Sequence, residues 1–292
     1  MKIGICQVDG KWPNLALAKC AGECLRMGDE VELFNALAVD SYDYLFASKV
    51  FTDTPDNPYL PEWAIRGGSG YDTNRSLWDH WEHAKPDWSL WPWWPHDMGY
   101  STRGCIRKCP FCIVPDKEGK LRVVAEFGDL TTGRPTMILH DNNVTAAPIE
   151  HFSQFCADAT EAGVEIDFRQ GLDARLLTDE HAAIIARSKF SRRIHLSFDN
   201  LAEAEAITEA VTTMRAAGIH PSRLTFYVLT GFNSTFENDM ERVDILRALG
   251  CDPFVMPYNR NTDWTLRRFA RWVNNKVAFK AMTWEQFKVA RV

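Results

Sequence analysis

The amino-acid sequence predicts an α/β protein in which a small Rossmann-like βαβ domain precedes an open (β/α)6 barrel of the TIM type. From Met137 onward, short apolar runs typical of strands begin at residues 137, 165, 193, 223 and 253. Segments with helical periodicity lie between them, and several end in a glycine that suits a helix C-terminus. A βα unit repeated in this way builds a parallel sheet. One more strand just before the cysteines at 105–112 makes six, which is too few for a closed eight-stranded barrel.

The elements in chain order divide the sequence into four parts. Residues 1–77 contain the strand-like runs IGICQV, EVELF and YLFASKVF with a helix between the first two, which predicts the Rossmann-like domain. Residues 78–97 form a connector with six tryptophans and three prolines, and prolines at that density disfavour a regular helix. We expect the tryptophans to serve packing more than ligand stacking. The barrel follows over residues 98–260, and residues 261–292 form a basic helical extension.

Composition sets limits on the class of protein. The chain has 292 residues, of which 46% are hydrophobic and 25% charged, and this balance is typical of a globular protein. It shows no apolar run long enough to cross a bilayer and no secretory signal at its start, so we expect a cytoplasmic protein. Eight cysteines in that compartment favour metal or thiol chemistry over disulfides.

Three of the cysteines form a compact motif. The segment GYSTRGCIRKCPFCIVP has the spacing C-x3-C-x2-C through Cys105, Cys109 and Cys112. Three thiolates can hold three irons of a [4Fe-4S] cluster and leave the fourth iron open. The alternative is a structural zinc site, which needs a fourth ligand such as His96, His140 or Cys156.

This segment resembles the signature loop of the radical S-adenosylmethionine superfamily, C-x3-C-x-aromatic-C, with Phe111 as the aromatic residue. The resemblance covers about residues 98–260. It implies that S-adenosylmethionine binds the open iron, that an electron from a donor such as flavodoxin or ferredoxin cleaves it, and that the resulting radical removes hydrogen from a substrate. It also implies that Phe111 helps to shape the adenine pocket.

Polar residues that follow the next three strands are the candidate cofactor ligands. The resemblance places them at the mouth of the barrel, where barrel enzymes hold their sites. Where relatives have Gly-Gly-Glu after the second strand, this chain has an acid and two amides. For each residue alone, a helix cap or a turn is the structural alternative. The candidates are Asp141, Asn142 and Asn143 after the second strand, Gln170, Asp173 and Arg175 after the third, and Ser197 and Asp199 after the fourth.

The N-terminal domain resembles the cobalamin-binding domain of one radical S-adenosylmethionine subgroup. Some cobalamin proteins carry an Asp-x-His-x-x-Gly loop, but here the first strand is followed by DGKWPN, with Lys11 in place of the histidine. Cobalamin is therefore possible, and we favour a cofactor-free domain.

The C-terminal extension indicates a partner. Residues 260–292 carry 8 basic and 2 acidic side chains. Leu266, Phe269, Ala270, Val273 and Val277 form an apolar helical stripe, which leaves Arg267, Arg268, Arg271 and Asn274 on the other side. Arginines on one helix face suit phosphate contacts, so we expect the three arginines to bind RNA or DNA, and the substrate to be a nucleic-acid base or nucleoside. A solvated helix that seals the barrel is the structural alternative.

Two other functions remain open from the sequence. One is a cobalamin-dependent radical methylase of a small molecule or peptide. The other is a non-enzymatic iron–sulfur or zinc protein that binds nucleic acid.

Overall fold

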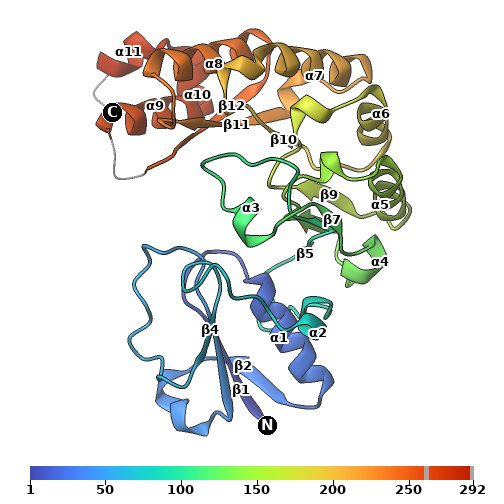
Figure 1. The fold of residues 1–292 in the computed structure, drawn as a ribbon, viewed down its shortest axis with the longest axis vertical. Coiled ribbons are helices and arrows are strands. Elements are labelled where there is room, and N and C mark those ends of the chain that lie inside the picture. Colours follow the sequence, from blue (N-terminus) through green and yellow to red (C-terminus); the bar gives the residue numbers. More distant parts are fainter. Residues whose placement is uncertain (260–262, 290–292) are drawn as a thin grey trace. The chain divides into compact units, whose positions relative to one another are not determined.

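The computed structural model describes residues 1–259 and 263–289, so the ends of the predicted C-terminal extension, residues 261–262 and 290–292, lie outside the described residues. The chain forms a mixed α/β structure with parallel sheets, as the sequence predicts. It divides into two compact units (Figure 1). Unit 1 contains Met1–Tyr100 and Ala125–Met137, and unit 2 contains Ser101–Val124 and the described residues from Ile138 onward.

Unit 1 is built on a parallel sheet with the strand order β2-β1-β3-β4. Helix α1 covers this sheet, and its first turn is capped by Asn14, whose side chain accepts a hydrogen bond from the Leu17 amide at 3.1 Å. Cys20 and Cys24 lie in the buried face of α1, where burial raises the pKa of their thiols to about 12 and about 11. The elements of this sheet are β1 (Lys2–Gln7), α1 (Leu15–Arg26), β2 (Glu30–Leu33), β3 (Tyr44–Ser48) and β4 (Ile65–Gly67).

The tryptophan-rich segment packs within unit 1. It contains one helical turn, α2 (Asp79–Glu82), and ends at β5 (Asp97–Gly99), while α4 (Phe127–Leu130) comes later in the chain. Trp81, Trp88, Trp91 and Trp94 are each at most 5% exposed, and the Trp88 indole donates to the buried Asp97 carboxylate at 3.1 Å. Trp78 and Trp93 stay exposed. A packing role therefore accounts for four of the six tryptophans.

Unit 2 carries the βα repeat that the sequence predicts. Its strands are β9 (Glu165–Phe168), β10 (Ile194–Ser197), β11 (Leu224–Thr230) and β12 (Asp252–Pro257), and β8 (Thr136–Leu139) crosses the boundary between the units. The intervening helices are α5 (Ile149–Glu161), α6 (Asp179–Arg187), α7 (Ala204–Ala216) and α8 (Phe236–Ala248). Five short 3-10 helices complete the connections: η1 (Ala36–Ser41) in unit 1, and η2 (Val144–Ala146), η3 (Ala174–Leu176), η4 (Leu201–Glu203) and η5 (Pro221–Arg223) in unit 2.

The strands of the βα repeat do not form one continuous sheet, although β10, β11 and β12 run parallel to one another. Strands β10, β11 and β12 make one sheet in that order, and β8 and β9 are neighbours in another. A single parallel bridge, Leu172 to Leu196, joins the segment after β9 to β10. The partial barrel therefore remains a prediction, while the parallel α/β order is observed.

The two faces of these strands differ in chemistry because side chains alternate along each strand. The face toward the helices is apolar, with Leu196, Phe226 and Val228 completely buried. In Figure 1, α7 and α8 run along this side of β10–β12. On the opposite face His195 stacks on Tyr227 with ring centroids 5.3 Å apart, and the His195 Nδ1 atom lies 3.4 Å from a carboxylate oxygen of Asp167.

The C-terminal helices pack on the edge of this sheet. They are α9 (Trp264–Asn274), α10 (Lys276–Ala281) and α11 (Trp284–Val289), and their core contains Phe269, Trp272, Phe279 and Trp284. Two sequence expectations were wrong here. Val277 is 78% exposed because α9 ends before it, and Asn274 faces β12, where its amide bonds the Val255 N–H at 2.8 Å and C=O at 2.9 Å.

No helix among the described residues is long and apolar enough to span a membrane.

A buried ion pair fixes the ends of β10 and β11. Arg242 and Asp239 of α8 are each 1% exposed at the side chain and form a direct pair at 2.5 Å. The Arg242 guanidinium also donates to the carbonyls of Phe198 and Leu229, both at 2.7 Å. Asp239 in turn accepts the Gly231 amide at 3.0 Å. The pair therefore links the end of β11 to the end of β10, where candidate residues Ser197 and Asp199 stand.

We predict that Arg242→Met lowers the free energy of unfolding by about 3–5 kcal/mol, because it leaves the Asp239 carboxylate buried without its partner. The matched control on the same helix is Asp244→Asn, which removes an exposed pair with Arg247 and costs about 1 kcal/mol or less. Urea unfolding of both variants measures the difference. Equal losses in the two variants would show that the buried pair has no special role.

Candidate functional site

The three motif cysteines lie on a loop of unit 2 whose two ends lie side by side. Short antiparallel strands β6 (Thr102–Arg103) and β7 (Arg122–Val123) close its base, and the pair Arg103–Glu118 at 3.0 Å links its two sides. Gly104 must be glycine, since its φ is +82° and a Cβ atom there would lie 2.3 Å from the Lys120 carbonyl oxygen. One helical turn, α3 (Val114–Lys117), follows the last cysteine. The sequence shows no sign of the β6–β7 pair because both strands are only two residues long.

The three thiols share one environment. Cys105, Cys109 and Cys112 are each partly exposed, and they interact electrostatically with one another. Desolvation by burial raises the pKa of the Cys109 and Cys112 thiols. The Cys105 sulfur accepts hydrogen bonds from the Arg107 amide at 3.3 Å and from the Asn143 Nδ2 atom at 3.4 Å.

These residues have the chemistry that a [4Fe-4S] cluster requires, although within the described part of the chain no three His, Cys, Asp or Glu side chains already form a metal-binding group. Three thiols on one partly exposed loop supply three ligands, and N–H groups directed at sulfur stabilise thiolate ligands. Of the candidate zinc ligands, Cys156 does not join them, because it is a completely buried core residue of α5.

Asp141 holds the root of the cysteine loop. It is 2% exposed and follows β8. Its carboxylate accepts the amide and hydroxyl of Ser101, at 3.1 and 2.6 Å, and the amide and hydroxyl of Thr102, at 2.5 and 2.6 Å. The sequence predicts that Asp141 binds the cofactor, and in the structure three of these bonds reach its Oδ1 atom and one reaches Oδ2. Burial raises the pKa of Asp141, while the four bonds oppose that rise.

The side chains of Asn142 and Asn143, which follow Asp141, bond the next residues of the cysteine loop. The Asn142 side-chain oxygen accepts the Gly104 amide at 2.9 Å. Asn143 is 3% exposed, and its Nδ2 atom donates to both the Cys105 sulfur and the Asp173 carboxylate. Its Oδ1 atom is buried and accepts no hydrogen bond from the described residues. Asp141, Asn142 and Asn143 thus hold three consecutive points of the segment from Ser101 to Cys105.

Asp173 joins the cysteine loop to the third strand end. Its carboxylate pairs with Arg107 of the loop at 2.9 Å and with Arg175 at 2.7 Å. Arg175 also pairs with Glu203 in η4. Burial opposes the charge on Asp173, but its hydrogen bonds to Arg175 and Arg107 lower its pKa overall. The predicted cofactor role of Arg175 therefore competes with two internal partners, which the residue spacing does not reveal.

The remaining candidates stand at the ends of β9 and β10. Gln170 is exposed in the turn after β9, and Ser197, partly exposed, ends β10. Asp199 accepts the Leu229 amide at 3.1 Å, and burial raises the pKa of its carboxyl to about 6. It interacts electrostatically with Cys109 and Cys112, so the structure brings it near the cysteine loop.

A row of aromatic rings leads away from the loop. Phe111 meets Phe232, after β11, edge to face with centroids 5.4 Å apart, and Phe232 meets Tyr258, after β12, at 4.7 Å. Tyr258 is 52% exposed. The sequence singled out Phe111 alone, because the other two rings follow strand ends more than 100 residues later and share no motif with it.

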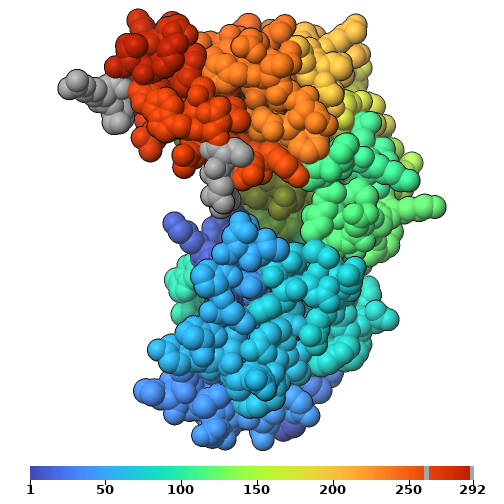
Figure 2. Space-filling model, turned by 60° about the vertical axis from the view of Figure 1, so that its left-hand side comes forward, coloured from blue at the N-terminus to red at the C-terminus, as the bar shows by residue number. Residues whose placement is uncertain are grey.

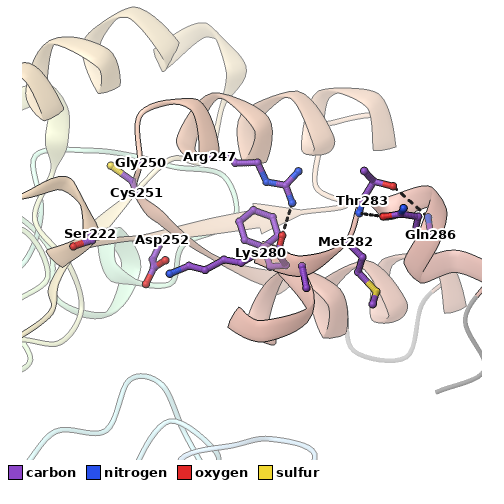
Figure 3. A pocket seen from close by; sticks show the side chains of 11 residues that line it. Ser222, Arg247, Gly250, Cys251, Asp252, Lys280, Met282, Thr283 and Gln286 are labelled. Atoms are coloured by element: carbon purple, nitrogen blue, oxygen red, sulfur yellow. Dashed lines mark hydrogen bonds between the residues drawn. The ribbon is translucent and has the colours of Figure 1, made fainter.

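A hollow of about 460 Å³ lies at the opposite end of the strands (Figure 3). It is lined by the start of β12, including Asp252, and by α10 and its neighbours, including Lys280 and Thr283. Arg247, which borders it, is already bonded to the Phe279 carbonyl at 2.7 Å. In parallel α/β folds the amino ends of strands serve stability, while sites lie at the carboxyl ends. We therefore place the candidate site at the cysteine loop.

No protein-family model matches the chain, and no curated protein matches it. Among solved structures, three of Streptococcus suis SuiB are similar at 14% identity: SuiB itself (TM-score 0.46), SuiB bound to the precursor peptide SuiA (0.47) and SuiB bound to S-adenosylmethionine (0.45). They cover 65%, 64% and 64% of this chain, which spans 48%, 46% and 45% of theirs.

This chain therefore spans less than half the length of the SuiB chains it resembles. At this identity and TM-score, the likeness establishes neither a shared family nor a shared activity.

We predict that Asp199→Asn stabilises the protein free of metal at pH 7 but not at pH 3.5. The pKa of Asp199 is raised from 3.8 to about 6, so the folded state binds this proton more tightly and loses stability as pH rises through that interval. A shift of two units corresponds to about 2–3 kcal/mol above pH 6. Asparagine keeps the acceptor for Leu229 and removes the buried charge.

Urea unfolding at the two pH values measures this effect, with Glu209→Gln on the exposed face of α7 as the control. A gain in Asp199→Asn that is the same at pH 3.5 and pH 7 would contradict the account.

Proposed function

We propose that this chain is a radical S-adenosylmethionine enzyme. The observation that carries the proposal is the cysteine loop: three thiols at the spacing C-x3-C-x2-C, held by Asp141, Asn142 and Asn143 at the carboxyl end of β8. A [4Fe-4S] cluster bound there would supply one electron that splits S-adenosylmethionine into methionine and a 5′-deoxyadenosyl radical, which takes a hydrogen atom from the substrate.

The residues of this chain then have distinct tasks. Cys105, Cys109 and Cys112 hold three irons. Asn143 offers its unpartnered Oδ1 atom, a buried acceptor that suits the ammonium group of the cofactor. Phe111, Phe232 and Tyr258 provide an aromatic wall for the adenine ring.

The polar residues at the neighbouring strand ends orient the cofactor. Arg175, which also pairs with Asp173 and Glu203, is the proposed donor to the cofactor carboxylate. Ser197, Asp199 and Gln170 are proposed to offer hydrogen bonds to ribose hydroxyls. Asp141 and Asn142 act on the loop rather than on the cofactor. An electron donor such as flavodoxin or ferredoxin is part of the proposal.

For the substrate we propose a base or nucleoside in RNA or DNA. Arg267 and Arg271 of α9 are exposed one turn apart, and Trp264 on the same helix face is 59% exposed. The C-terminal helices form part of the surface (Figure 2). Arg268 serves the fold instead, since it donates to the Phe287 carbonyl at 3.0 Å and lies over the rings of Trp264 and Phe287.

We do not favour cobalamin as a second cofactor. In a parallel sheet of order β2-β1-β3-β4, a ligand binds where the strand order reverses, at the carboxyl ends of β1 and β3. There the Asp9 carboxylate accepts the amides of Val50 and Phe51, both at 2.8 Å. The chain's own carboxylate thus takes up the donors that a ligand would use, which supports a domain without the corrin.

The test of the proposed function needs no substrate. Protein reconstituted without oxygen should contain about four irons per chain, and with a strong reductant and S-adenosylmethionine it should release 5′-deoxyadenosine and methionine. Cys105→Ala, Cys109→Ala and Cys112→Ala should each abolish the release, while Cys251→Ala, in a buried core position, should not. A protein that holds zinc, or a cluster that yields no 5′-deoxyadenosine, would contradict the proposed enzymatic activity.

A second test addresses the substrate. Replacing Arg267 and Arg271 with Gln should weaken binding of a single-stranded oligonucleotide and lower its salt slope by roughly 0.7 per lost contact. The control is Lys280→Gln with Lys288→Gln, which removes the same charge from α10 and α11. If both double variants bind alike, net charge alone explains the effect and the α9 site is wrong.

A further inference from the structure

The contact between Asn143 and Cys105 has a consequence for the cluster. Asn143 stands in the DNN run after β8, and its side chain is 3% exposed. Its Nδ2 atom lies 3.4 Å from the Cys105 sulfur and 3.2 Å from a carboxylate oxygen of Asp173. Both neighbours accept hydrogen bonds, so the orientation of the amide follows from chemistry: the nitrogen faces them.

The position of this amide is fixed from two sides. Asp173 is itself held by Arg107 and Arg175, and its own backbone amide donates to the Thr145 hydroxyl at 3.0 Å. On the other side, Asp141 and Asn142 fix the segment that leads to Cys105. The side-chain NH2 group of Asn143, held in this way, has one hydrogen for Asp173 and one for the Cys105 sulfur.

Among the three cysteines of the motif, only Cys105 accepts a hydrogen bond at its sulfur from a side-chain N–H in the described residues, in addition to the Arg107 amide at 3.3 Å. Hydrogen bonds to the cysteine sulfurs raise the reduction potential of an iron–sulfur cluster, because they stabilise the extra negative charge of the reduced form. The three cysteine ligands therefore differ in the number of side-chain hydrogen-bond donors at their sulfur atoms.

We propose that Asn143 is a positioning residue that fixes the Cys105 ligand and raises the reduction potential of the cluster through its N–H···S bond. This inference rests on the proposed function, because it needs a redox-active cluster on these cysteines. The Nδ2 atom of Asn143 would affect how readily the cluster accepts an electron. The Oδ1 atom of the same side chain would instead bind the cofactor.

The test is the midpoint potential of the cluster in the full chain, measured by a redox titration followed by electron paramagnetic resonance, without S-adenosylmethionine. Asn143→Leu removes the donor at similar volume, and at a fixed potential the ratio of reduced to oxidised cluster should fall about fivefold. At about 59 mV per tenfold change, this is a shift of about 40 mV to lower potential. Asn143→Asp, which adds a negative charge as well, should shift it further.

Two other variants complete the test. Gln154→Leu removes an exposed side-chain amide of α5 that bonds Asp158, and it should leave the potential unchanged. Asn143→Ser keeps a hydroxyl donor and should restore part of the wild-type potential. If Asn143→Leu folds but assembles no cluster while Asn143→Ser does, the positioning role is supported directly.

Wild-type potentials in both Asn143→Leu and Asn143→Asp would overturn the inference. This failure is distinct from failure of the proposed function: a wild-type protein that releases 5′-deoxyadenosine while its Asn143 variants keep the wild-type potential refutes the inference alone. A wild-type cluster whose potential responds to Asn143 but which cleaves no S-adenosylmethionine refutes the enzyme alone.

Discussion

The candidate site depends on one buried carboxylate. Asp141 is 2% exposed and receives four hydrogen bonds from two consecutive residues, Ser101 and Thr102. A buried carboxylate is tolerated only where hydrogen bonds replace its hydration, and here the donors come from the segment that enters the cysteine loop. The loop therefore cannot move away from the end of β8 without exposing an unsatisfied charge. Asn142 and Asn143 extend this attachment to Gly104 and Cys105.

Hydrophobic periodicity was sufficient to predict the arrangement of strands and helices. The apolar runs at 165, 193, 223 and 253 appear as β9 to β12 within one residue, because strand and helix periods are local properties of the sequence. The cysteine spacing is equally local, so the motif was visible as well. The closure of the strands into a barrel is a long-range property, and it stays a prediction.

The roles of individual polar residues were harder to predict because they depend on partners distant in sequence. Asp141 and Arg175 were predicted to bind a cofactor, and the structure adds internal partners that the sequence did not reveal, namely Ser101, Thr102, Asp173 and Glu203. Asn274 was expected on the solvent side of its helix and instead bonds the backbone of β12. In each case residue type predicted a hydrogen bond correctly, while the identity of the partner required the tertiary structure. Phe232 and Tyr258 were not predicted as site residues because their ring contacts also join residues distant in sequence.

The central claim is that three cysteines hold a cluster whose fourth iron is open to S-adenosylmethionine. Mössbauer spectroscopy of protein reconstituted with ⁵⁷Fe tests it most directly, because each iron contributes separately to the spectrum. The account predicts that adding S-adenosylmethionine changes the signal of one iron in four and leaves the other three unchanged. A spectrum that does not respond to S-adenosylmethionine, with four equivalent irons, would contradict it.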